Sequence, residues 1–157
     1  MKKNINIEIE VYNQLSELNS SEQALILKAK EIAKQAYAPY SKFYVGAALL
    51  LDNGEIVTGN NQENAAYPSG ICAERTAIFY ANAQYPQAAI ETLAVAVFKN
   101  NEYAEQPVTP CGSCRQVMLE AENKHQTTMR VIMIGEKQIY VANSVKDLLP
   151  LSFDSLD

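Results

Sequence analysis

The sequence predicts an α/β fold in which a mixed sheet lies between helices. Some segments alternate apolar and polar residues or form short apolar runs, which indicates strands. Other segments have the apolar spacing of amphipathic helices. The two kinds follow one another in the order β-α-ββ-α-β-α-β-β, which is typical of layered α/β domains. The 157 residues contain no repeat or domain-scale linker and predict one domain, with an N-terminal extension over 1–16 and a core over 17–157.

Each element has its own signal. Residues 4–12 alternate as a half-buried strand does. A cap at Ser20 or Ser21 begins an amphipathic helix over 21–37, and Pro39 ends it. The later elements, in chain order, are an apolar strand over 43–51, a return strand over 55–60 after a DNG hairpin turn, a helix over 71–84, a buried strand over 91–98, a helix over 111–122, strands over 129–135 and 137–142, and a short helix over 144–150.

The composition argues against several classes of protein. Apolar residues make up 48% and charged residues 20% of the chain, which is ordinary for a globular protein. The net charge is -5, and the lack of a basic cluster argues against a polynucleotide substrate. No apolar run reaches the ~18 residues of a membrane helix, and we expect no secretory signal. Three cysteines suit no closed disulfide framework, so we expect a reducing, cytoplasmic location.

All three cysteines lie at predicted helix starts. Cys72 stands in SGICAERTA, and Cys111 and Cys114 form a C-x-x-C pair in PCGSCRQ. A free cysteine often packs in a core, and a lone C-x-x-C is a redox dithiol, half of a zinc site or a coincidence. None of these interpretations accounts for Glu74, a carboxylate two residues after Cys72 in an otherwise core-like helix.

Taken together, the three cysteines match a catalytic zinc site. Such a site has three protein ligands and one open position, and helix starts favour thiolates. Three thiolates leave the site negatively charged, so Arg75 or Arg115 is expected to donate to a sulfur. Glu74 is too close to Cys72 for a comfortable fourth ligand. It can instead take a proton from the water that zinc acidifies and pass it to a substrate. Cys-x-Glu with Pro-Cys-x-x-Cys is the cysteine form of the zinc nucleobase-deaminase signature.

With these residues in view, the chain resembles the cytidine deaminases, in particular the small homotetrameric kind. The similar segments are YAPYSKFYVGAALL (37–50), NNQENAAYPSGICAERTA (60–77) and PCGSCRQVM (110–118), and the resemblance runs from about residue 23 to 154. It implies a three-layer α/β/α fold with a five-stranded mixed sheet. It also implies a homotetramer with one zinc per chain that hydrolyses cytidine and deoxycytidine to uridine and deoxyuridine in pyrimidine salvage, with release of ammonia.

The resemblance assigns roles to individual residues. The zinc ligands are Cys72, Cys111 and Cys114, Glu74 is the proton shuttle and Arg75 bonds the ligand sulfurs. Substrate contacts are expected from Phe43 near the ribose and base, Asn61 and Glu63 at the sugar hydroxyls, the backbone of Ala73 at the ring, the carbonyl of Thr109 at the exocyclic amine, and Tyr67 and Phe153 in a neighbouring subunit's site. His125, the only histidine, is interpreted as a solvated loop residue.

Three rival interpretations remain from the sequence. Blasticidin-type and other small-ring deaminases use the same zinc chemistry, although Asn61 and Glu63 favour a substrate with a ribose. A polynucleotide-editing deaminase fits the motif but not the acidic charge. A non-catalytic zinc-binding protein would normally have a closed site with four ligands, and only three are present.

Overall fold

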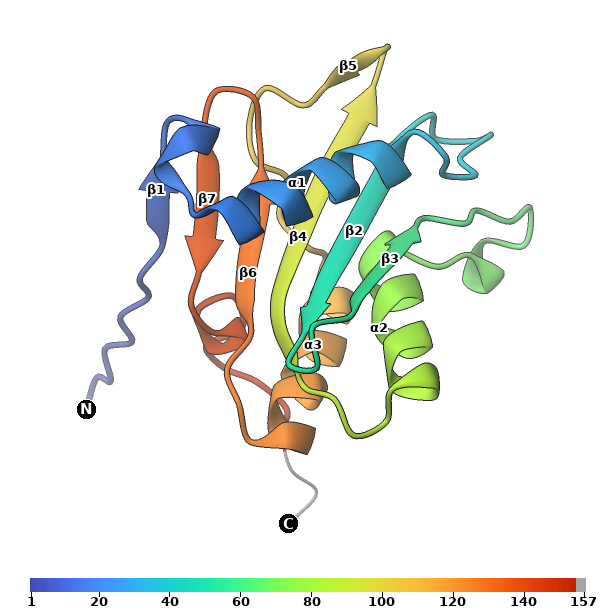
Figure 1. Ribbon diagram of the computed structural model, residues 1–157. Coiled ribbons are helices and arrows are strands. Elements are labelled where there is room, and N and C mark those ends of the chain that lie inside the picture. The colour runs from blue at the N-terminus through green and yellow to red at the C-terminus, as the bar shows by residue number, and fades with distance from the viewer. Residues whose placement is uncertain (155–157) are drawn as a thin grey trace.

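The computed structural model describes residues 1–154 and confirms the predicted layered α/β fold (Figure 1). Within these residues, seven strands form one mixed sheet in the order β1-β7-β6-β4-β2-β3, and β5 pairs with β4. The strands are β1 (Glu10–Tyr12), β2 (Tyr44–Leu51), β3 (Ile56–Asn60), β4 (Ile90–Lys99), β5 (Glu102–Tyr103), β6 (Arg130–Ile134) and β7 (Ile139–Ala142). Among these seven strands of the described chain, β4 and β6 are the one parallel pair.

The expected count of five strands is too low by two. The N-terminal extension adds β1, which pairs antiparallel with β7 at one edge of the sheet. The residues after β4 fold back as β5. The strand expected over 4–12 is formed only at 10–12, because the earlier residues extend away from the body and have no partner strand within the described chain (Figure 1). The end of the predicted core, residues 155–157, lies outside the described residues.

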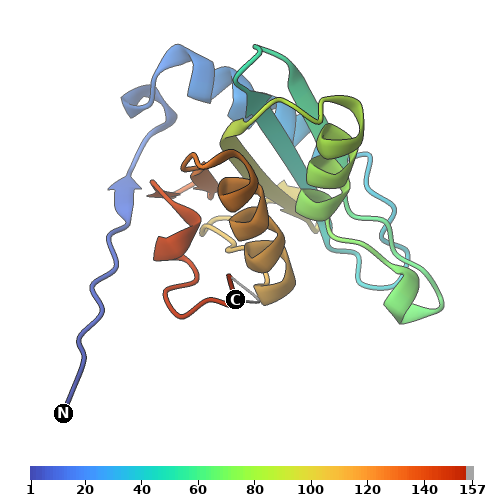
Figure 2. The same cartoon turned by 90° about the horizontal axis from the view of Figure 1, so that it is seen from below.

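Helices cover both faces of the sheet (Figures 1 and 2). One face packs against α1, and the other packs against α2 and α3, so that two separate core clusters form. The helices are α1 (Ser20–Ala33), α2 (Ala73–Gln84) and α3 (Gly112–His125), with 3-10 turns η1 (Leu15–Glu17), η2 (Tyr67–Ser69) and η3 (Val145–Asp147). In the described part of the chain, no helix is long and apolar enough to span a membrane.

The cap of α1 differs from the prediction. Asn19, rather than a serine, accepts a hydrogen bond from the backbone N–H of Glu22 at 2.9 Å, and the Glu22 carboxylate accepts one from Asn19 N at 3.1 Å. The helix also ends at Ala33 instead of residue 37. After this point Tyr37 N donates to the Asn61 carbonyl at 3.0 Å, because the chain pairs with the loop after β3.

The topology brings two helix starts to the same edge of the sheet. β3 and β4 both pair antiparallel with β2, so they run in the same direction on either side of it. α2 follows β3, and α3 follows β4 and β5. Both helices therefore begin at the carboxyl ends of these strands, the edge at which open α/β sheets commonly bind ligands.

Small residues let α2 begin directly against the sheet. A Cβ atom at Gly59 of β3 would lie 2.5 Å from the backbone nitrogen of Ala77 and 2.8 Å from the carbonyl oxygen of Ala73. Ala73, Ala77 and Ala81 form a buried stripe along this side of α2. The first turn of α2, which carries Glu74, is therefore held close to the end of β3.

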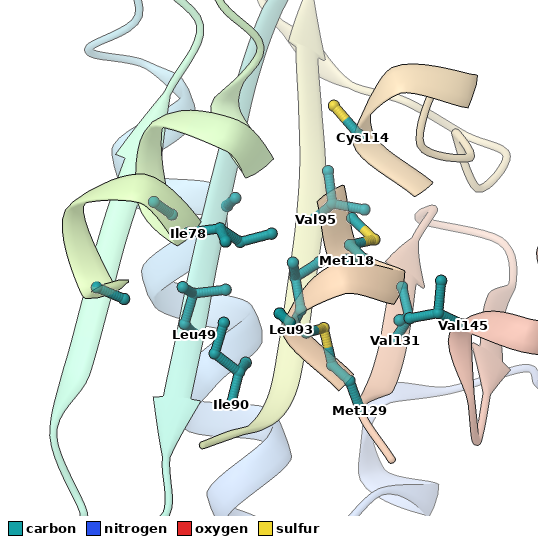
Figure 3. Close-up of a cluster of buried hydrophobic side chains, with 14 of the residues drawn as sticks. Leu49, Ile78, Ile90, Leu93, Val95, Cys114, Met118, Met129, Val131 and Val145 are labelled. Carbon is teal, nitrogen blue, oxygen red and sulfur yellow. The ribbon is translucent and has the colours of Figure 1, made fainter. Parts of the chain in front are cut away.

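The core cluster between the sheet and the helices α2 and α3 extends up to the start of α3 (Figure 3). Leu49, Leu93 and Val95 supply its sheet side, and Ile78 and Met118 supply its helix side. Cys114 belongs to the same cluster and is fully buried. One of the candidate metal ligands is thus fixed by core packing.

Candidate functional site

The structure brings the three cysteines together from two helix starts. Cys72 is the N-cap of α2, Cys111 is the N-cap of α3 and Cys114 lies in the first turn of α3. Neither capping side chain bonds a backbone amide. The three Sγ atoms lie within 4.8 Å of one another. The sulfurs therefore converge on one point instead of capping their own helices.

This donor set fits a zinc ion. The Sγ atoms of Cys72 and Cys111 are 3.9 Å apart. Two thiolates on tetrahedral zinc, each with a bond of ~2.3 Å, would be separated by ~3.8 Å. In the described chain no fourth histidine, cysteine or carboxylate oxygen joins this group. A zinc ion bound here keeps one coordination position for a ligand from the cleft.

Positive charge beside Cys72 favours the ionised form of its sulfur. Arg75, one turn after Cys72, donates from Nη2 to the Cys72 Sγ at 3.5 Å. The hydrogen bond from the Cys114 thiol, together with that from Arg75, lowers the pKa of Cys72 to about 5. The same sulfur–sulfur hydrogen bond and burial raise the pKa of Cys114. Cys72 thus ionises before Cys114, and Arg75 in the first turn of α2 stabilises its thiolate.

Glu74 is a buried carboxylate at the base of the site. Its residue exposure is 5%, and it follows Cys72 in the first turn of α2. Burial raises the pKa of Glu74 above its usual range, and the nearby charge of Cys72 adds to this shift. A carboxyl whose pKa is raised toward neutrality can both accept and donate protons, which is the property of a general acid–base group.

Cys72, Cys111 and Glu74 line a cleft of about 740 Å³, and Cys114 is buried behind them. Most of its walls are apolar, and its polar groups come from the segment before β2, the loop after β3, the first turn of α2 and the segment before α3. Six of the seven expected substrate contacts line it, namely Phe43, Asn61, Glu63, Tyr67, Ala73 and Thr109. A cleft of this kind, with a few polar groups on apolar walls, is typical of a small-molecule site.

Asn61 and Glu63 hold the wall of the cleft. Asn61 Oδ1 accepts from Val45 N at 2.7 Å, and Asn61 Nδ2 donates to the Phe43 carbonyl at 2.9 Å. The Glu63 carboxylate accepts from Tyr40 N at 2.9 Å, from Ser41 N at 3.2 Å and from the Ser41 hydroxyl.

Hydrogen bonding therefore fixes the loop that carries Phe43 from two sides. The Ser41 hydroxyl in turn accepts a hydrogen bond from Phe43 N at 3.1 Å. Ser41 was not predicted as a site residue from the sequence. Its hydroxyl, close to Phe43 within the family-like segment 37–50, was the signal that could have identified it.

Two expected contacts lie at or beyond the rim of the cleft. Tyr67 is 79% exposed, and its ring packs edge-on against that of Tyr40, with centroids 6.4 Å apart. Phe153 is 67% exposed and lies outside the cleft of its own chain, and its carbonyl accepts a hydrogen bond from Gln116 Nε2 at 2.7 Å.

Two other sequence interpretations are corrected. Arg115 does not direct its guanidinium at a sulfur, since Nε, Nη1 and Nη2 contact the Pro110 carbonyl, the Leu148 carbonyl and the Thr109 hydroxyl. His125 is not a solvated loop residue, because it closes α3, is half-buried, and has its Nε2 shielded from solvent.

Comparisons with known proteins agree with this geometry. Residues 19–130 match the family described as the cytidine and deoxycytidylate deaminase zinc-binding region. A cytidine deaminase of Halalkalibacterium halodurans is 38% identical, over 86% of this chain and 96% of that protein. One from Sporosarcina psychrophila is 42% identical, over 86% and 93%. The crystal structure of a cytidine deaminase from Burkholderia pseudomallei superposes with a TM-score of 0.73 at 39% identity, covering 87% of this chain and 100% of that one.

The donor set makes a prediction about metal content. Cys111→Ala removes one of three sulfurs, and two thiolates hold zinc far less tightly, so we expect the bound zinc to fall well below one per chain. Elemental analysis of the purified protein measures this directly. Ser113→Ala is the matched control, since Ser113 lies exposed between the two ligands and should leave the zinc content at one. Full zinc occupancy in Cys111→Ala would show that the metal binds elsewhere.

Proposed function

This chain belongs to the cytidine and deoxycytidylate deaminase family, and we infer that it catalyses the zinc-dependent hydrolysis of cytidine and deoxycytidine to uridine and deoxyuridine, with release of ammonia. The observation that carries this conclusion is the convergence of three thiols and one buried carboxylate at the end of a nucleoside-sized cleft. The polar side chains on the cleft wall provide places for a sugar to bind.

We propose that Cys72, Cys111 and Cys114 hold the zinc. The metal, when bound, lowers the pKa of a water molecule toward ~7 and so supplies a nucleophile for C4 of the pyrimidine. Arg75 offsets part of the negative charge of the three sulfurs through its contact with Cys72. This neutralisation matters because three thiolates otherwise weaken the metal as a Lewis acid.

Glu74 is proposed as the proton carrier. It accepts a proton from the attacking water and delivers it to N3 of the ring, which makes C4 more electrophilic. It then takes the proton of the hydroxyl group that has added to C4 and moves it to the 4-amino group, so that the C4 carbonyl forms as the C4–N bond breaks and ammonia leaves. The raised pKa of Glu74, caused mainly by its burial, suits both steps, since it makes the carboxyl a better proton acceptor than an exposed one.

The remaining cleft residues are proposed to bind and orient the nucleoside. Phe43 packs beside the ribose and base, and Asn61 and Glu63 bind the sugar hydroxyls. The Ala73 backbone contacts the pyrimidine ring, and the Thr109 carbonyl accepts from the exocyclic amine. Lone pairs of the Glu63 carboxylate and one N–H of the Asn61 amide are available for this, beyond the contacts that hold the cleft wall.

Assembly into a homotetramer is proposed as well. Phe79 and Tyr80 of α2 are 48% and 56% exposed, and Tyr67 and Phe153 are exposed near the cleft and on the tail. Exposed aromatic side chains are enriched where proteins associate. In the tetramer, Tyr67 and Phe153 would complete the site of a neighbouring subunit. We also propose a cytoplasmic location, because three free thiol ligands need a reducing compartment.

The role of Glu74 is tested by Glu74→Gln, which keeps the shape of the side chain but carries no proton at neutral pH. Loss of the cytidine absorbance band measures turnover, with cytosine, CMP and adenosine as comparison substrates. We expect turnover to fall by at least ~10²–10⁴-fold. Zinc content should remain at one per chain, and cytidine should still bind in calorimetry.

Melting temperature separates this role from a structural one. A neutral glutamine avoids the cost of burying a carboxylate, so the variant should melt no lower than the parent. A lower melting temperature with nearly normal turnover per folded molecule would mean that Glu74 is structural. Absence of deamination in the zinc-loaded parent would refute the proposed function itself.

Sugar recognition by Glu63 is tested with a double comparison. Glu63→Gln should raise KM for cytidine by about 5- to 150-fold, as expected for ~1–3 kcal/mol lost at a hydrogen-bonded partner. 3′-Deoxycytidine lacks the 3′-hydroxyl of the sugar. Parent and variant should have similar KM values for it, since loss of this hydroxyl and loss of the Glu63 carboxylate remove the same interaction. Equal losses on both substrates would instead mean that Glu63 only holds the loop at Tyr40 and Ser41.

The assembly is tested by mass and by complementation. Light scattering should give four times the chain mass of 17.4 kDa. Glu74→Gln and Tyr67→Ala chains should each have low activity, and unfolding and refolding them together should restore part of it. Restoration requires Tyr67 of one subunit to serve Glu74 of another. A fully active monomer, or mixed chains without recovery, would contradict the shared site.

A further inference from the structure

The guanidinium of Arg115 connects three parts of the chain near the cleft. Nε donates to the Pro110 carbonyl at 2.8 Å, Nη1 to the Leu148 carbonyl at 2.7 Å and Nη2 to the Thr109 hydroxyl at 3.1 Å. Pro110 and Leu148 are buried, and Leu148 closes the η3 turn near the C-terminus. One side chain thus ties the segment before α3 to the C-terminal turn.

The segment that Arg115 holds has little other hydrogen bonding. Residues 106–110 lie between β5 and α3 and have no regular secondary structure. Within the described residues, no backbone-to-backbone hydrogen bond involves them, and Arg115 is their sole side-chain donor. Their upstream end packs on Gly135, where an added Cβ would lie 2.6 Å from Gln106 and Pro107. The downstream end depends on Arg115.

This downstream end lines the cleft. Val108, Thr109 and Cys111 are among the lining residues, and Cys111 follows Pro110 directly. We propose that Arg115 is a positioning residue of the reaction, which fixes the Thr109 carbonyl at the exocyclic amine and the Cys111 sulfur at the metal by bracing their segment against Leu148. This inference rests on the proposed function, because the amine contact presupposes a 4-amino pyrimidine.

The planar shape of the guanidinium explains why an arginine is required. Nε and Nη1 reach two carbonyls of different segments at once, and Nη2 fixes the Thr109 side chain. Hydrogen bonds from a charged donor are stronger than neutral ones. A lysine carries the same charge as a single point and cannot bind three oxygens in this fixed arrangement. Arg115→Lys therefore removes the bracing geometry while it keeps the charge.

Small displacements of this segment should affect the chemical step. A misplacement of about 1 Å in a reacting arrangement can cost on the order of 10²-fold in rate. The amine is the leaving group, so a shifted Thr109 carbonyl no longer orients it. A ligand without the 4-amino group donates no hydrogen bond to the Thr109 carbonyl, so a shift of this carbonyl should not weaken its binding.

The test compares Arg115→Lys with the parent enzyme on two ligands. We expect kcat/KM for cytidine to fall about 10- to 100-fold. The inhibition constant of uridine, which lacks the 4-amino group and does not add water at C4, should change by less than about threefold, because the ring and sugar contacts remain. Zinc should stay at one per chain, but its release to a colour-forming chelator should become faster, since Cys111 is less firmly placed.

Arg130→Lys is the matched control. Arg130 is also partly buried and bonded by its guanidinium, to Glu22 at 2.6 Å and to Asn143, but it lies at the start of β6, away from the cleft. Its replacement should lower the melting temperature and leave zinc release and ligand discrimination unchanged.

Three results would overturn the proposal. The first is normal cytidine turnover and zinc release in Arg115→Lys. The second is an equal loss on both ligands, which would mean a general distortion of the site. The third is failure of Arg115→Lys to fold, which would make Arg115 a residue of global stability. If the parent does not deaminate cytidine, the proposed function fails, and the zinc-release comparison still decides whether Arg115 positions Cys111.

Discussion

Holding three sulfurs at one point is the physical constraint on which the rest of this structure depends. Thiolates repel one another, so their approach within 4.8 Å needs compensating positive charge. The metal supplies most of it, and two helix starts and Arg75 add to it. The two helix starts meet only because β3 and β4 run in the same direction on either side of β2. The glycine at position 59 then allows α2 to begin directly at the end of its strand.

Much of this could be predicted from the sequence, because its signals are local. Helix periodicity, the DNG turn and the apolar runs predicted the order of the elements, and the spacing of Cys72, Glu74, Cys111 and Cys114 predicted the metal chemistry. The resemblance to the cytidine deaminases is confirmed by the family match. Each motif spans only a few residues, whereas the meeting of Cys72 with Cys111, 39 residues later, was inferred from the two motifs taken together.

The errors concern interactions between distant parts of the chain. The alternation over 4–12 predicted a strand, but the count of five implied by the resemblance left out β1, whose pairing with β7 joins residues from opposite ends of the sequence. α1 ends early because Tyr37 bonds to Asn61. The direction of the Arg115 side chain was also not predictable, since its partner Leu148 is 33 residues away. The sequence offers no local signal for such contacts.

Three buried glutamates have different roles, which the structure distinguishes and the sequence alone does not. Glu122 accepts hydrogen bonds from Met129 N at 2.7 Å and Val145 N at 2.9 Å, so it closes the end of α3. Glu22 caps α1 and pairs with Arg130. Both carboxylates have structural partners that offset the cost of their burial.

Glu74 differs from the other two in its surroundings. Its burial raises its pKa, and its neighbours are the thiols of the candidate metal centre and the open cleft. No basic residue forms a salt bridge with it in the described chain. A carboxyl that is buried without an ion-pair partner lowers the stability of the fold. The free-energy cost of burying Glu74 is therefore best explained by proton transfer, because this role requires a carboxyl that can change its charge at this position.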